Sequence, residues 1–273
     1  MMTGQTSQVW EVVETSSGRH FALKLLLPEN TRSPEHRRFL FHEGEVGLQL
    51  HHQNIIRVLR LVRDRVNPYI VMEFFPSTNL KLRLMRKNPL VQEKAYEIIE
   101  QTAKGLAAMH DHGWIHRDVK PDNILVNSSG EVRIIDFALA QRIRKGSLLS
   151  WLFRSRSTMG TRSYMSPEQI RGEPLDERAD LYSFGITMYE LLTGRPPFRG
   201  LNPGDLLHRH LTEIPQSPRV LNPEVTEECA NLILRMLAKK KTDRPRDFHE
   251  FLAAFRNMRV FKTAPAETKR SQE

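Results

Sequence analysis

One long segment of the chain constrains its fold more than any other. Residues 177–194, ERADLYSFGITMYELLTG, are apolar on nearly every side when they are placed on a helix. A surface helix would show one apolar face, whereas this segment requires neighbours all round it. We therefore expect a central buried helix in a domain large enough to surround it.

Other parts of the second half also have the pattern of helices. The apolar positions of residues 91–110 recur at helical spacing. A short strand pair is expected where ILV and VRII flank the turn NSSG at residues 127–130. Further helices are expected near residues 203–212, 225–238 and 246–256.

The first 75 residues alternate in the manner of β-strands instead. The expected strands are residues 9–14, 19–27, 55–62 and 68–74. The first two flank the turn TSSG and predict a hairpin, and Ser33-Pro34 is a typical start for a helix reaching about Leu50. We expect an α+β fold with a small β-rich lobe and a larger, mainly helical lobe.

The composition fits a globular protein of the cytoplasm. No apolar run approaches the ~20 residues that a membrane helix needs, so no membrane association is expected. The single cysteine, Cys229, excludes an internal disulfide and fits a reducing compartment.

Basic residues exceed acidic ones, with 41 Lys and Arg against 32 Asp and Glu. The excess lies in short clusters at residues 36–38, 142–145, 154–156 and 239–246. No RNA-binding aromatic signature and no zinc finger accompanies it, so we interpret the clusters as solvated surface and expect no nucleic-acid partner. The histidines at 51–52 and 208–210 are likewise interpreted as surface residues, because the first pair lies in a turn and the second group has no third metal ligand nearby in the sequence.

The segment HRDVKPDN, residues 116–123, carries the strongest chemical signal. Phosphoryl transfer from ATP to a hydroxyl requires an acceptor for the hydroxyl proton, a cation near the transferred group and an oxygen ligand for Mg²⁺. Asp118, Lys120 and Asn123 supply these three groups within six residues.

From about Gly4 to Arg246 the chain resembles the eukaryotic-like Ser/Thr protein kinase superfamily. The resemblance rests on the order of the motifs FALK, FHEGE, HRDVKPDN, DFA, SPE, ADLYSFG and DRP. It implies that Lys24 contacts ATP and pairs with Glu43, with Glu45 as the alternative partner. It also implies that Asp180 braces the catalytic loop and that Arg244 forms a purely structural ion pair with Glu168.

The resemblance divides the chain into a kinase domain over residues 1–262 and a polar tail over 263–273. The N-lobe would cover about 1–73, the hinge about 73–79 and the C-lobe about 80–262. ATP would bind between the lobes with Mg²⁺, or Mn²⁺ as an alternative. The expected contacts of the nucleoside are Val9 and Ala22 above the adenine, Leu125 below it, Met72 behind it, the backbone of Glu73 and Phe75, and Asn79 at the ribose.

Two departures from the family pattern bear on activity. In DFA the aspartate, Asp136, is kept as the second expected Mg²⁺ ligand, but Ala138 replaces a glycine and loses access to positive φ. In the glycine-rich loop only Gly4 remains of three glycine positions, although glycines there let backbone amides approach the phosphates. The first strand should also begin before this loop, so part of it is missing or lies upstream of Met1; we favour the second.

The type of kinase follows from resemblance alone. Lys120 within RDVKPDN and the segment GTRSYMSPEQI are typical of enzymes that act on Ser or Thr of a protein, and YMSPEQI resembles the bacterial branch. Thr161 would shape the acceptor site. Arg117 often binds a phosphorylated activation loop, for which the candidate sites are Ser155, Ser157 and Thr158.

Three functions remain open at this point. An active protein kinase is favoured because Lys24, Glu43, Asp118, Asn123 and Asp136 are all present. A nucleotide-binding pseudokinase or scaffold is the alternative, given the poor glycine-rich loop and DFA. A small-molecule phosphotransferase would not be expected to carry SPE, Arg244 or the GT segment.

Overall fold

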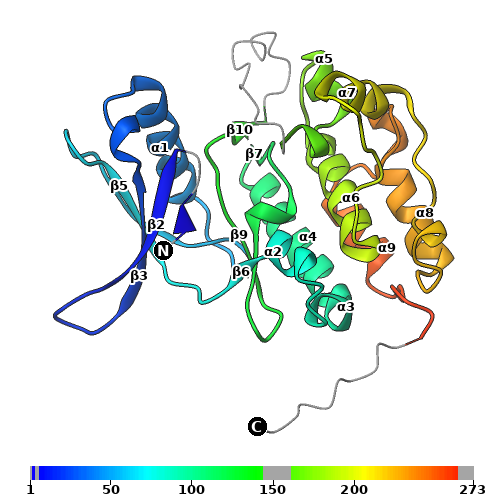
Figure 1. The fold of residues 1–273 in the computed structure, drawn as a ribbon, viewed down its shortest axis with the longest axis horizontal. Helices are drawn as coiled ribbons and strands as arrows, with labels where there is room; N and C mark the ends of the chain where they lie inside the picture. The colour runs from blue at the N-terminus through cyan, green and yellow to red at the C-terminus, as the bar shows by residue number, and fades with distance from the viewer. Residues whose placement is uncertain (1, 4–5, 144–160, 264–273) are drawn as a thin grey trace, which may run out of the picture.

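The computed structural model describes residues 2–3, 6–143 and 161–263. It has the α+β architecture expected from the sequence, with a sheet-rich N-terminal part and a helical C-terminal part lying side by side (Figure 1). No helix within these ranges is long and apolar enough to cross a membrane.

The N-terminal part is an antiparallel sheet of five strands in the order β1-β2-β3-β5-β4. The strands are β1 (Met2–Thr3), β2 (Ser7–Val13), β3 (His20–Leu26), β4 (Val58–Val62) and β5 (Tyr69–Glu73). The predicted hairpin is β2 and β3, while β1 pairs with β2 only at Val9 and Gln8. Helix α1 (Pro34–Gly47) packs against β3, β4 and β5, and it begins as predicted: Ser33 caps it and Pro34 takes its first turn.

Two smaller sheets lie where the two parts meet. Strands β6 (Thr78–Asn79), β8 (Ile124–Val126) and β9 (Val132–Ile134) form one, and β7 (Trp114–Ile115) pairs with β10 (Gln141–Arg142) in the other. Ile134 ties β9 to the N-terminal part, because its N–H donates to Asn54 and its carbonyl accepts from Ile56.

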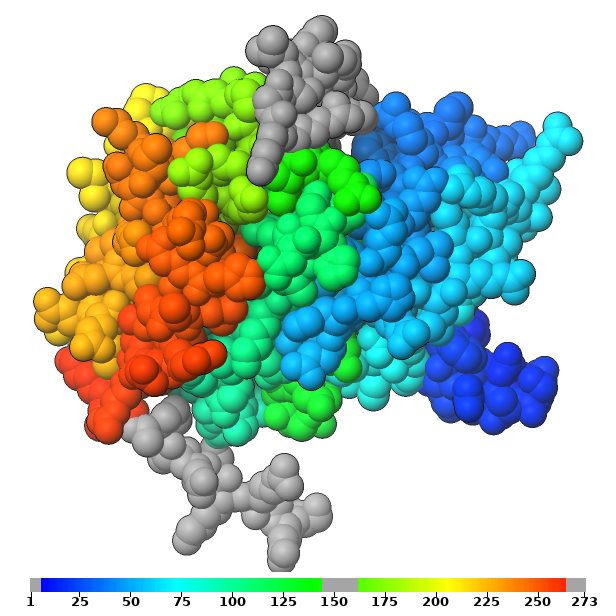
Figure 2. Space-filling model, turned by 180° about the vertical axis from the view of Figure 1, so that it is seen from behind, coloured from blue at the N-terminus to red at the C-terminus, as the bar shows by residue number. Residues whose placement is uncertain are grey.

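The C-terminal part is built around α6 (Arg178–Thr193), in which every residue except the first and last is buried. The prediction of a central buried helix is therefore confirmed. Near the end of the chain, α9 (Phe248–Phe255) packs on α4 (Ala95–Asp111), where Tyr96 stacks on Phe255 at 4.9 Å, and Figure 2 shows this side of the molecule. The other helices are α2 (Leu80–Met85), α3 (Leu90–Glu93), α4 (Ala95–Asp111), α5 (Pro167–Arg171), α7 (Pro203–Thr212), α8 (Glu227–Met236) and α9 (Phe248–Phe255), with 3₁₀ turns η1 (Pro28–Asn30), η2 (Pro121–Asn123), η4 (Thr161–Tyr164), η5 (Pro218–Val220) and η6 (Lys241–Asp243).

The structure corrects two expectations. The single helix predicted over residues 91–110 is divided into α3 and α4 at Lys94, whose φ of −111° leaves the helical region. The interpretation of residues 208–210 as surface histidines is wrong for His210, which is fully buried on the inner side of α7. Its ring packs edge-on against Phe198 and shares a hydrogen bond of 3.1 Å with the Tyr182 hydroxyl, so this histidine belongs to the core.

Candidate active site

Lys24 and Glu43 form an ion pair between the sheet and α1. The ammonium nitrogen of Lys24 lies 2.7 Å from each carboxylate oxygen of Glu43. Glu45, the alternative partner, is exposed and contacts Arg63 instead. Residues two apart on a helix do not share a face, so only Glu43 can project from α1 toward β3.

Burial and charge act in opposite directions on this pair. Burial raises the pKa of Glu43 to about 7, which the charge of Lys24 only partly offsets. For Lys24, burial favours the neutral amine, but the carboxylates of Asp136 and Glu43 outweigh it and raise the pKa above its ordinary value. Lys24 is therefore charged, and its nitrogen lies 3.9 Å from the Asp136 carboxylate.

The loop after β7 gathers polar groups around Asp118. Its carboxylate oxygen Oδ2 accepts hydrogen bonds from Lys120 Nζ at 2.7 Å and from Asn123 Nδ2 at 2.9 Å. The same amide nitrogen of Asn123 donates to the Asp118 backbone carbonyl at 2.8 Å. Burial raises the pKa of Asp118 above its ordinary value although Lys120 opposes the shift, so this carboxylate binds a proton more readily than an exposed one.

Asp180 on α6 binds the backbone at the start of the loop that carries Asp118. Its two carboxylate oxygens accept the backbone N–H groups of His116 at 2.7 Å and Arg117 at 2.8 Å. His110 Nε2 adds a contact of 2.8 Å. Burial alone would raise the pKa of Asp180, but these hydrogen bonds outweigh it and keep the pKa below its ordinary value. The buried helix predicted first from the sequence thus fixes the loop that carries Asp118.

Strained backbone marks the same region. Arg117 and Asp136 both have φ of 68°, a conformation that residues other than glycine rarely adopt. Ala138 is not among the described residues with positive φ, and its N–H donates to Asp136 Oδ1 at 3.3 Å. The positive φ that was expected at the glycine position of the motif, Ala138, is therefore found two residues earlier, at Asp136.

Phe137 links the Asp136 segment to α1. Its ring is buried and lies edge-on to His116 at 6.0 Å. It also lies under α1, since a Cβ atom added to Gly47 would come within 3.4 Å of the ring. Sequence reasoning assigned no role to His116, although it begins the HRDVKPDN segment. Its Nδ1 accepts the Asp118 N–H at 3.2 Å, and its Nε2 lies 3.1 Å from the Ile135 carbonyl.

The residues expected at the nucleoside lie on strands β2, β3, β5, β6 and β8, with Phe75 just after the end of β5. Val9 is paired across β2 and β3 with Lys24, and Ala22 is paired with Met72 on β5. Leu125 lies on β8, and Asn79 caps α2 by accepting the Leu82 N–H at 2.8 Å.

Glu73, at the end of β5, is held in place by its side chain. The carboxylate accepts the Arg57 N–H at 2.9 Å and pairs with Arg133 Nε at 3.2 Å. The guanidinium of Arg133 also lies 4.6 Å from the centre of the Phe75 ring. The connection between the two parts of the molecule is therefore anchored to β9.

One of the remaining expected residues has a place in the described structure. Thr161 begins η4, which leads into the SPE segment. Gly4, Ser155, Ser157 and Thr158 lie outside the described residues.

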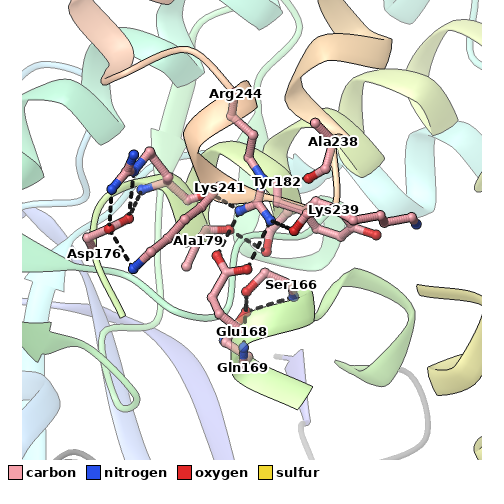
Figure 3. A network of polar contacts seen from close by, with 12 residues as sticks. Ser166, Glu168, Gln169, Asp176, Ala179, Tyr182, Ala238, Lys239, Lys241 and Arg244 are labelled. Atoms are coloured by element: carbon pink, nitrogen blue, oxygen red, sulfur yellow. Dashed lines mark hydrogen bonds and ion pairs between the residues drawn. The ribbon is translucent and has the colours of Figure 1, made fainter. Parts of the chain in front are cut away.

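A second ion pair, Arg244 with Glu168, lies within the C-terminal part (Figure 3). Its two nitrogen–oxygen contacts measure 2.7 and 2.9 Å. The other donors of the guanidinium reach the carbonyls of Ala238, Arg178 and Lys239. Next to Glu168, Gln169 donates to the Arg117 carbonyl at 3.0 Å, so this network reaches the loop of Asp118.

Comparison with known proteins agrees with this geometry. The family model for the protein kinase domain matches residues 3–254. A probable serine/threonine-protein kinase of Streptomyces coelicolor is 34% identical over 240 residues, which cover 86% of this chain and 35% of the relative. Serine/threonine-protein kinase PknB of Mycobacterium tuberculosis is 31% identical over 268 residues, covering 97% of this chain and 42% of the relative.

The chain thus spans well under half the length of these relatives. The matched region nevertheless contains the Lys24–Glu43 pair, the Asp118 loop, Asp136 and the Arg244–Glu168 pair. The chain belongs to the protein kinase family.

Proposed function

We propose that the chain is a protein serine/threonine kinase, which transfers the γ-phosphoryl group of Mg-ATP to a hydroxyl of a protein. The observation that carries this proposal is the arrangement of Lys24, Glu43, Asp136 and Asp118. The charged Lys24 is paired with Glu43 at 2.7 Å and lies 3.9 Å from Asp136. The charge of Asp136 also contributes to the raised pKa of Asp118. Phosphoryl transfer depends mostly on such positioning and electrostatic stabilisation.

In this proposal Asp118 orients the acceptor hydroxyl and takes its proton. Its raised pKa makes the carboxylate a stronger base, and the hydrogen bond from Asn123 fixes its direction. Lys120 neutralises charge on the transferred group. Lys24, held by Glu43, contacts the phosphates of ATP from the opposite side.

The oxygen ligands fit Mg²⁺, or Mn²⁺ in its place. No group of three or more His, Cys, Asp and Glu side chains suited to a metal occurs in the part of the chain that the structure describes. Mg²⁺ bound with ATP needs only one or two protein oxygens, because the phosphates and water supply the others. Asp136 offers its carboxylate, whose pKa stays low since Lys24 outweighs the effect of burial. Asn123 donates its NH₂ group to Asp118, which leaves its carbonyl oxygen for the ion. When bound, the ion would offset negative charge on the phosphates.

The nucleoside would contact both parts of the molecule. Adenine would lie between Val9, Ala22 and Leu125, bounded by Met72, and would bond to the backbone of Glu73 and Phe75. Arg133 supports this assignment because it holds both hinge residues at once. At the ribose, Asn79 would use its amide nitrogen, since its oxygen caps α2.

Control by phosphorylation is a second part of the proposal. The Arg117 Nε atom is buried and has no hydrogen-bond partner among the described residues, and burial lowers the pKa of this side chain. A phosphate on Ser155, Ser157 or Thr158 would supply the missing acceptor. Mass spectrometry after incubation with Mg-ATP should find phosphate on one of these residues, and its absence there would remove this part alone.

The experiment that tests the proposed function is transfer of γ-labelled phosphate from Mg-ATP to the chain itself and to a generic acceptor protein. Wild type is compared with Asp118→Asn, which keeps the shape of the side chain, and with wild type in the presence of a chelator. We expect transfer in the first sample only. If wild type transfers nothing while ATP still raises its melting temperature, the chain is a nucleotide-binding scaffold and the proposal is wrong.

A further inference from the structure

Arg133 is a partly buried cation on β9, where the two parts of the molecule meet (Figure 1). Its side chain is 20% exposed, and its Nε atom donates to Glu73 Oε1 at 3.2 Å. Its guanidinium carbon lies 4.6 Å from the centre of the Phe75 ring. One side chain of β9 therefore contacts both hinge residues whose backbone groups are expected at adenine.

Glu73 is also fixed by the backbone that precedes β4. Its N–H donates to the Arg57 carbonyl at 2.9 Å, and its carboxylate accepts the Arg57 N–H at 2.9 Å. These two bonds hold the end of β5. Arg133 is the only side chain that bonds to the Glu73 carboxylate in the described part of the chain, and it alone extends the support to Phe75.

The strand that carries Arg133 also adjoins the other side of the expected adenine site. Arg133 lies directly opposite Leu125 in the antiparallel pair of β9 and β8, so the two side chains leave the same face of this small sheet. The next residue, Ile134, bonds through its backbone to Asn54 and Ile56 of the N-terminal part. Arg133 therefore joins the hinge to a strand that is itself held in place.

We propose that Arg133 is a positioning residue for adenine, which holds the hinge against the sheet face that carries Leu125. The inference rests on the proposed function, because it adds a residue to the same nucleotide site. Hydrogen bonds between a purine and a backbone depend on distance and angle, so the hinge must be accurately placed. A hinge that is ordered before binding also avoids the entropy cost of ordering it around the ligand.

Loss of Arg133 should therefore weaken binding of the nucleoside and leave the transfer step unchanged. Arg133→Met removes the guanidinium but keeps an apolar stem, and the bonds of Glu73 to Arg57 should keep β5 intact. A hydrogen bond to adenine that is weakened in this way corresponds to about threefold to tenfold in affinity.

The experiment measures the dissociation constant of adenosine by calorimetry, together with KM for ATP and kcat at saturating ATP. Arg133→Met is compared with wild type, with Arg133→Lys and with Glu73→Gln, which keeps an acceptor for the Arg57 N–H. The double variant Arg133→Met/Glu73→Gln completes a thermodynamic cycle. Arg60→Met is the matched control, because Arg60 is an exposed arginine of β4 that lies opposite Val71 of the same β5.

We expect Arg133→Met to raise the adenosine dissociation constant and KM for ATP by about threefold to tenfold, with kcat close to wild type. Arg133→Lys should be intermediate, since an ammonium can pair with Glu73 but has no planar group to lie over Phe75. Arg60→Met should behave as wild type. In the double variant the two effects should not add, because both substitutions break the same contact.

Two results would overturn the inference and leave the kinase function intact. One is unchanged adenosine affinity in folded, active Arg133→Met. The other is a fall in kcat with KM unchanged, which would assign Arg133 to the support of the phosphates rather than of adenine.

Failure of the kinase function itself would look different, because no variant would then transfer phosphate. The adenosine series decides the inference in that case, since adenosine has no phosphate to transfer. Equal affinities of wild type and Arg133→Met, or no binding of adenosine to wild type, would contradict it. Melting curves of all variants verify that they are folded.

Discussion

Two buried ion pairs of similar chemistry occupy the two parts of this molecule. Arg244 and Glu168 have side chains 0% and 3% exposed, and all five N–H donors of the guanidinium reach an acceptor. Lys24 is 14% exposed and, among the described residues, donates hydrogen bonds only to the two oxygens of Glu43, since Asp136 at 3.9 Å is beyond hydrogen-bond distance. A cation whose N–H donors all have acceptors cannot bind a ligand as well, whereas a cation with a free N–H donor can.

The two pairs also differ in what surrounds them. The Arg244 guanidinium lies over the Tyr182 ring at 4.9 Å, and it joins η6 to α5 and α6. Lys24 joins β3 to α1 through Glu43, and a second carboxylate, that of Asp136 in the DFA segment, lies 3.9 Å from its nitrogen. Loss of the first pair should therefore affect folding, and loss of the second should affect transfer.

The largest expected effect is that of Lys24→Met on phosphoryl transfer. Removing one positioned charge of this kind lowers a rate by about 10²–10³-fold. Stability should change little, because Glu43, whose pKa burial raises to about 7, can take up a proton when its partner is lost. The measurement is γ-phosphate incorporation beside a melting curve.

The matched control for this change is Glu45→Gln on the same helix. Glu45 is exposed and pairs with Arg63, so its loss should leave transfer unchanged. A comparable loss of transfer in both variants would show that α1 as a whole had been disturbed, and the contrast between the two ion pairs would fail.

Arg244→Met should have the opposite profile. It leaves Glu168 buried without its partner, and breaking such a pair costs about 3–5 kcal/mol of the free energy of unfolding. Denaturant titration measures this loss, and transfer per folded molecule should remain close to wild type. Adding Glu168→Gln should restore part of the stability, since the unpaired charge is then gone. A variant as stable as wild type would contradict the structural role.

Acid should lower the stability of the C-terminal part, which holds the Arg244–Glu168 pair, through protonation of His210. Burial, with the nearby charge of Lys239, lowers the pKa of His210 to about 3, against about 6.5 in an unfolded chain. Below pH 6.5 the unfolded state therefore binds more protons, so stability is full above that pH and falls as the pH drops toward 3. Between pH 6.5 and pH 5 the loss should be about 2 kcal/mol.

The groups that face His210 identify where this loss acts. The Tyr182 hydroxyl contacts its Nδ1, and Lys239 donates to its carbonyl at 2.9 Å. In His210→Gln, denaturant titrations at the two pH values should show a smaller difference than in wild type. The same difference in both proteins would assign the acid sensitivity to other groups.

The sequence predicted the larger elements because their patterns extend over several turns or strands. The buried segment at 177–194 and the hairpin of β2 and β3 both appear in the structure. The short helices α2 and α5 were missed, since fewer than two turns cannot show a helical period. Each is preceded by a residue that caps its N-terminus, Asn79 for α2 and Ser166 for α5. These capping residues were the sequence signal from which the two helices could have been predicted.

Burial and long-range partners could not be read from residue spacing. His210 was interpreted as a surface residue because its segment, HRH at residues 208–210, has no third metal ligand nearby in the sequence. The pairing of Lys81 with Glu190 joins residues 109 positions apart, and no local pattern indicates it. Motif order located Lys24 and Asp118, but their distances to Glu43, Asp136 and Asn123 required the fold.

The smallest expected effect is that of Ala138→Gly, which restores the residue common in the family. Ala138 keeps its N–H bonded to Asp136, and its own φ is not positive. The methyl group therefore causes no strain in this conformation, and transfer should change by less than about threefold, well below the effect of Lys24→Met. Stability should fall by about 0.4–1 kcal/mol, because glycine adds freedom to the unfolded chain. A large gain in transfer would mean that alanine holds the Asp136 segment away from its active arrangement. In that case the unused hydrogen-bonding capacity of Lys24 would not be enough for transfer while alanine restrains the Asp136 segment. The functional difference between the two ion pairs would then depend on the position of that segment rather than on Lys24 itself.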